Sequence, residues 1–152
     1  MARHVRVRYD QIRRAYDQGS AEARYFLDVE TGETIAVFVE LIERGGNQED
    51  ARRIASGVNV RYFLVPHKAS RDGYAEMEDF IGTVEDRHLR TSLLEALEGK
   101  SPFRRFRDIL VSYPPEEERW LRERDRRIHD EIDDWLRKHE IVLEDSGDRS
   151  EP

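Results

Sequence analysis

The chain has 152 residues, of which 33 are acidic and 26 are basic, so its formal net charge is −7. This length fits one domain, and the acidic balance is unlike that of a dedicated nucleic-acid-binding protein. The chain contains no cysteine, which excludes disulfides, thiolate metal sites and cysteine nucleophiles. No apolar run is long enough to span a membrane or to form a signal peptide, and we therefore expect a cytoplasmic protein without membrane contact.

The first 65 residues are expected to form a short helix and a small set of strands. Gly32 lies between two β-rich runs and supplies the positive φ of a hairpin turn. Pro66 lacks the N–H that a ladder needs and should stop the last strand. The predicted segments are a helix at 9–17 ended by Gly19, strands at 24–29, 34–39 and 58–65, and a brief helix at 49–55.

From about residue 70 the apolar residues recur every three or four positions, which predicts helices. Asp86 and Ser101 are each placed to cap a helix, and the prolines at 114–115 precede a long final helix to about His139. The apolar residues expected to face inward are Tyr74, Met77, Phe80, Ile81, Val84, Leu89, Leu93, Ala96, Leu97, Phe103, Phe106, Leu110, Tyr113, Leu121, Ile128, Ile132, Trp135 and Leu136.

Strands that precede the helices, instead of alternating with them, favour an α+β fold. We expect an antiparallel sheet of about three strands packed against about four C-terminal helices, with the short N-terminal helix in addition. Residues 1–143 should form a single domain. The tail 144–152 has four acidic residues against one arginine and no core-forming residue, so it should be disordered.

The predicted hairpin contains Leu27-Asp28-x-x-Thr31-Gly32-Glu33, and residues 99–108 read Gly-Lys-x-x-Phe-Arg-Arg-Phe-x-Asp. These two strings, in this order and with Trp120 downstream, resemble a bacterial family known only as an uncharacterised protein family. The resemblance extends from about residue 9 to residue 141. It implies no activity and no catalytic residue, but it supports treating this span as one compact unit.

The candidate binding surface is the helix face that carries Arg104, Arg105 and Arg107. Guanidinium groups suit carboxylate or phosphate partners, and Trp120 offers an aromatic anchor for another chain. The outer face of the sheet or the final helix would complete this surface. The alternative is that the arginines pair with acidic residues of the same chain while Phe103 and Trp120 belong to the core.

Asp28 is the remaining candidate, because it is an acidic residue in an otherwise apolar strand. Such a residue should point inward to meet an arginine such as Arg104 or Arg105. Glu30 projects from the same strand face, so the two carboxylates could instead hold a divalent cation or share acid–base chemistry.

The most favoured interpretation is a non-enzymatic interaction or regulatory module that binds a protein partner or a second copy. Two alternatives stay open: a nucleic-acid-associated protein that uses the arginines of residues 3–14 and 104–107, and an enzyme built around Asp28 and Glu30. The five histidines show no zinc-binding pattern, and no nucleotide-binding loop is present, so we expect no metal and no cofactor.

Overall fold

The computed structural model has the expected α+β fold and describes residues 2–46, 48–68 and 70–144. It divides into two compact units, which are described separately. Unit 1 combines residues 1–68 with residues 129–152, and unit 2 comprises residues 69–128. The single domain over 1–143 stays a prediction. Of the predicted disordered tail, residues 145–152 lie outside the described residues, whereas the N–H of Glu144 donates to the Val5 carbonyl at 2.8 Å.

The central feature of unit 1 is an antiparallel sheet with strand order β3-β2-β4. Strands β2 (Ala23–Asp28) and β3 (Thr34–Phe38) form the predicted hairpin, with Tyr25 opposite Ala36. Strand β4 (Tyr62–Leu64) is much shorter than the strand predicted at 58–65. The segment before it is a turn in which the N–H groups of Arg61 and Tyr62 both donate to the Gly57 carbonyl, so its β-branched residues misled the prediction.

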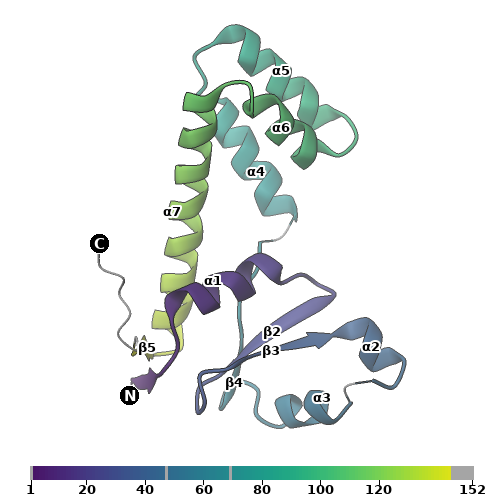
Figure 1. Cartoon of the computed structure of the whole chain (residues 1–152), viewed down its shortest axis with the longest axis vertical. Helices are drawn as coiled ribbons and strands as arrows, with labels where there is room; N and C mark the ends of the chain where they lie inside the picture. The colour runs from purple at the N-terminus through teal and green to yellow at the C-terminus, as the bar shows by residue number, and fades with distance from the viewer. Residues whose placement is uncertain (1, 47, 69, 145–152) are drawn as a thin grey trace. The chain divides into compact units, whose positions relative to one another are not determined.

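A second, parallel pair of strands joins the two ends of the chain (Figure 1). Strand β1 (Arg3–Val5) pairs with β5 (Ile141–Leu143), and Val5 is buried. The sequence suggested only arginines for nucleic-acid contact at residues 3–14, and that interpretation was incomplete. A strand of three residues has too little periodicity to be recognised when its partner lies at the other end of the chain.

Helices cover both faces of the three-stranded sheet (Figure 1). Helix α1 (Tyr9–Gln18), predicted at 9–17, contacts β2 and β3 and buries Ile12, Ala15 and Tyr16. The hydroxyl of Tyr16 donates to Glu131 of α7 at 2.7 Å. On the other face, Ile54 of α3 (Gln48–Ala55) packs with Val37 and Tyr62. Helix α2 (Val39–Glu43) directly follows β3, at the residue where the strand was expected to end.

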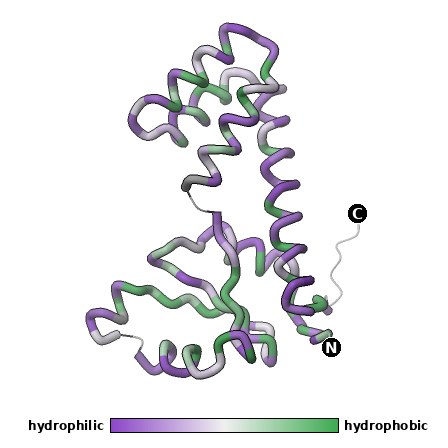
Figure 2. Tube along the Cα trace, turned by 180° about the vertical axis from the view of Figure 1, so that it is seen from behind, coloured by the Kyte–Doolittle hydropathy of each residue, from purple (hydrophilic) through white to green (hydrophobic). Residues whose placement is uncertain are grey.

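Unit 2 consists of α4 (Ser70–Ile81), α5 (Arg87–Glu98), α6 (Pro102–Leu110) and the first part of α7 (Pro114–Lys138). Its core contains the rings of Phe80, Phe106 and Trp120, which meet edge to face with centroids 5.0 to 6.1 Å apart. Figure 2 shows the hydrophobic residues of α7 as short segments in a mainly hydrophilic helix. Within the described residues, no helix combines the length and the apolarity needed to cross a membrane.

The two predicted helix caps of unit 2 have different outcomes. Asp86 caps α5, because its carboxylate accepts from the Leu89 N–H at 3.0 Å. Ser101 precedes α6 as expected, but its side chain makes no capping hydrogen bond and its φ is +51°. The prediction that the Ser101 side chain caps α6 was therefore wrong.

Candidate interaction groove

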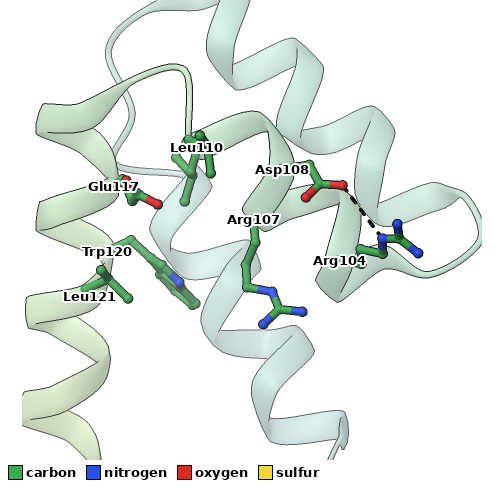
Figure 3. Close-up of a pocket in the computed structure, with 8 residues that line it drawn as sticks. Arg104, Arg107, Asp108, Leu110, Glu117, Trp120 and Leu121 are labelled. Carbon is green, nitrogen blue, oxygen red and sulfur yellow. Dashed lines mark ion pairs between the residues drawn. The ribbon is translucent and has the colours of Figure 1, made fainter.

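A groove in unit 2 runs between α6 and the first turns of α7 and encloses about 410 Å³. Figure 3 shows Arg107 and Leu110 of α6 and Glu117, Trp120 and Leu121 of α7 around the same space. A second hollow of about 330 Å³ shares Arg107, Trp120 and Leu121 with it. We call the two together the α6–α7 groove. Its lining residues are Met77, Phe103, Arg104, Phe106, Arg107, Asp108, Leu110, Val111, Glu117, Trp120, Leu121 and Arg124.

The floor of the groove is apolar. Phe106, Leu110 and Trp120 are buried beneath it, with Trp120 only 9% exposed. Its edges hold apolar side chains that stay in solvent: Phe103 is 39%, Val111 61% and Leu121 51% exposed. Large apolar side chains that gather at a hollow mark a contact surface more often than single exposed ones do.

The prediction that Phe103 and Leu121 face inward was therefore wrong. Their helical spacing is right, but the contact between Phe106 and Trp120, with ring centroids 5.0 Å apart, already closes the core beneath them. Tyr113, by contrast, packs against this core as expected.

Three arginines surround the apolar floor. Arg104 is 80% exposed and lies 3.9 Å from Asp108, which is a loose ion pair (Figure 3). Arg107 and Arg124 are exposed, and neither has an ion pair with any residue in the described part of the chain. These guanidinium groups are therefore open to solvent.

The structure brings together only some of the predicted binding residues. Three of them, Arg104, Arg107 and Trp120, line the groove. Arg105 does not line it, and its guanidinium instead lies where a β-carbon on Gly99 would be. Val111 and Arg124 also line the groove, although neither was a candidate from the sequence. The spacing of Arg104, Arg107 and Val111 by three and four residues could have placed Val111 on the arginine face.

Asp28 belongs to unit 1, where it is 4% exposed at the end of β2. It points inward and meets an arginine, as expected, but that arginine is Arg61 and not Arg104 or Arg105. The guanidinium donates to both carboxylate oxygens at 2.9 Å. Arg61 lies next to the start of β4, which pairs with β2, so the sheet register brings the two residues together.

Further hydrogen bonds occupy the Asp28 carboxylate. Its Oδ1 accepts from the N–H groups of Glu30 at 2.9 Å and Thr31 at 3.4 Å. Burial raises the pKa of Asp28, but the hydrogen bonds from Arg61, Glu30 and Thr31 outweigh that effect, so the pKa is below its ordinary value. A buried carboxylate held ionised by an arginine and two backbone N–H groups is typical of a structural group, because a lowered pKa makes it a weak general base.

The two strings that suggested the family now have physical roles. The hairpin string supplies Asp28, Thr31 and Gly32 to one hydrogen-bonded turn, and the second string builds α6 and one wall of the groove. The model of the Uncharacterised protein family (UPF0158) matches residues 3–151. The chain belongs to the UPF0158 family.

A UPF0158 protein of Pseudomonas aeruginosa strain PAO1 is 23% identical to the chain over 139 residues. The match covers 91% of this chain and 86% of that relative. No solved structure matches the chain. The bacterial uncharacterised family suggested by the two strings is thus confirmed.

The structure also locates the residues of the metal and acid–base alternative. The side chain of Glu30 is 65% exposed, and Glu30 lies 3.2 Å from Arg61, which neutralises part of its charge. Among residues 2–46, 48–68 and 70–144, no three histidine, aspartate or glutamate side chains are grouped so that they could hold a metal ion. The α6–α7 groove, which is lined by Arg104, Arg107 and Trp120, is the candidate site of this UPF0158 chain.

Proposed function

We propose that this UPF0158 protein is a non-enzymatic interaction module of the cytoplasm whose α6–α7 groove binds a protein partner. The partner segment carries apolar side chains for the floor and carboxylates for the surrounding arginines. One observation carries the proposal: Arg104, Arg107 and Arg124, without tight ion pairs in the described residues, surround the exposed side chains of Phe103 and Leu121. The absence of cysteine suits a reducing compartment.

The energetics support an apolar segment as the main contact. Full burial of a leucine, valine or phenylalanine side chain contributes roughly 1.5 to 3 kcal/mol. Leu121, Val111 and Phe103 are each partly exposed, so a partner that covers them gains a fraction of this amount from each. The arginines add specificity and speed of association more than affinity, because exposed ion pairs are screened by salt.

The test is a capture experiment with the full chain and two matched variants. In the groove variant, Arg107→Glu and Leu121→Asp remove one cation and one apolar contact. The control is Arg87→Glu, because Arg87 is also exposed and begins α5, where a negative charge suits the helix dipole. Both variants are checked for folding by circular dichroism and thermal unfolding before use.

Proteins captured from a lysate of the source organism are identified by mass spectrometry, with and without nuclease treatment. We expect a discrete protein that the wild type and Arg87→Glu both retain, that the groove variant loses, and that nuclease does not affect. The bound segment, found by cross-linking, should contain apolar residues flanked by aspartate or glutamate. A partner retained by the folded groove variant, or lost on nuclease treatment, would refute the proposal.

A further inference from the structure

Unit 1 contains a separate hollow of about 610 Å³, which shares no lining residue with the α6–α7 groove. One wall comes from β4 and the residues that follow it, including Phe63 and His67. The other wall comes from the end of α7, with Trp135, Lys138 and His139. We call it the β4–α7 pocket. Its volume falls in the range of sites that bind small organic molecules.

The aromatic side chains of this pocket are held in place by one another. The ring of His139 lies 4.9 Å from that of Phe63 and 5.8 Å from that of Trp135, centroid to centroid. The guanidinium of Arg3 lies 5.0 Å from the ring centroid of Phe63, and it donates to the carbonyl of Val60. The wall is therefore ordered before any ligand arrives, which lowers the entropic cost of binding.

The charge of the pocket is opposite to that of the whole chain. The protein carries 33 acidic residues, yet none of the described residues that line the pocket is acidic. Lys138 is exposed at its rim and forms no ion pair in the part of the chain that the structure describes. Burial, followed by the charges of Lys138 and Arg3, keeps the pKa of His139 below its ordinary value. Among its described residues, the pocket thus combines one lysine cation and no lining carboxylate with an aromatic wall.

We propose that the β4–α7 pocket binds a small molecule with a planar aromatic ring and an anionic group. The ring packs against Trp135, and the anionic group meets the ammonium of Lys138. Aromatic rings pack favourably in offset or edge-to-face geometry, and an ammonium forms charge-assisted hydrogen bonds with carboxylate or phosphate. A nucleotide and an aromatic carboxylate both have this chemistry.

The experiment follows the two indole N–H signals in nitrogen-labelled protein, because the chain has only two tryptophans. Trp135→Phe assigns them. The probes are adenosine 5′-monophosphate and indole-3-acetate, with adenosine and inorganic phosphate as controls for the ring alone and the anion alone. We expect at least one probe to shift the Trp135 signal at millimolar concentration and to leave that of Trp120 unchanged. Which probe binds more tightly then distinguishes a nucleotide from an aromatic carboxylate.

The role of the cation is tested separately with Lys138→Ala, for which Lys100→Ala, an exposed lysine of unit 2, is the control. Loss of a charge-assisted hydrogen bond should weaken binding about tenfold in Lys138→Ala and leave it unchanged in Lys100→Ala. The proposal is overturned if neither probe shifts the Trp135 signal, or if adenosine or phosphate alone binds as tightly as the probes. Equal affinity in Lys138→Ala would also overturn it.

Discussion

The guanidinium of Arg61 and the carboxylate of Asp28 form a bidentate ion pair between the end of β2 and the start of β4, with both N–O distances at 2.9 Å. Asp28 is 4% exposed, whereas the Arg61 side chain is 37% exposed. The pair therefore fixes the turn that follows β2 to the residue that precedes β4. The same carboxylate orders the N–H groups of Glu30 and Thr31, so one buried side chain connects the hairpin turn to its neighbouring strand.

The first prediction concerns this ion pair. Arg61→Met removes the guanidinium and leaves Asp28 buried without its main partner. Removal of one member of a fully buried pair costs roughly 3–5 kcal/mol, and because Arg61 is partly in solvent we expect a loss of about 2 kcal/mol in the free energy of unfolding. Urea unfolding followed by circular dichroism measures this loss.

A double-mutant cycle with Asp28→Asn separates the ion pair from other effects. The asparagine keeps an oxygen that accepts from the backbone, so the double variant should be less destabilised than the sum of the two single variants. Additive losses would show that Arg61 and Asp28 contribute independently, contrary to this prediction.

The second prediction compares two glycines that both have positive φ. Gly32 has φ +83°, and a β-carbon there would overlap the carbonyl oxygen of Arg6. Gly45 has φ +90° and open space around it. Alanine at either position carries the left-handed backbone penalty of about 1 kcal/mol. Gly32→Ala should cost about 2 kcal/mol more than Gly45→Ala, because the backbone near Arg6 must move. Equal melting temperatures for the two variants would contradict the close approach.

The hairpin and the helices were predictable because their signals are local. Residues 27–33 carry their own turn chemistry, and the apolar spacing of unit 2 continues through several turns of each helix. The pairing of β1 with β5 could not be predicted in this way. Val5 and Val7 do alternate with arginines in the sequence, but a strand of three residues is too short for this alternation to identify it. Its partner strand lies at the opposite end of the chain, so no local pattern indicates the pairing.

The candidate groove was predictable only in part, for the same reason. Helical spacing placed Arg104 and Arg107 on one face of α6, and they do line the groove. Arg105 directly follows Arg104, so it points about 100° away around α6, and its guanidinium lies beside Gly99. Arg124 joins the site only because α7 packs beside α6. Tertiary contacts of this kind are not encoded in the period of a single helix.

The third prediction uses the two predicted helix caps as a pair. Asp86 accepts a hydrogen bond from the Leu89 N–H, so Asp86→Ala should lower the free energy of unfolding by about 1 kcal/mol. The Ser101 side chain makes no capping hydrogen bond, so Ser101→Ala should change the free energy of unfolding by less than about 0.5 kcal/mol. Thermal unfolding of the two variants measures both values, and a larger loss at Ser101 would mean that its hydroxyl does cap α6.

The fourth prediction concerns pH. Burial lowers the pKa of His139 from its ordinary value of 6.5, and the charges of Lys138 and Arg3 lower it further. As the pH falls below about 6.5, the unfolded chain takes up a proton that the folded chain does not yet bind, so the folded state loses stability. The loss continues until the pH passes the pKa of the folded protein, with a slope of at most about 1.4 kcal/mol per pH unit for one group.

His139→Phe keeps a ring between Phe63 and Trp135 but removes the titrating group. The difference in unfolding free energy between wild type and variant should therefore change between about pH 7 and pH 5, with the wild type losing more stability in acid. The pKa of Asp28 is lowered from 3.8, so its contribution is lost only in more acidic solution and does not overlap this window. A difference that stays constant across that range would show that His139 titrates alike in both states.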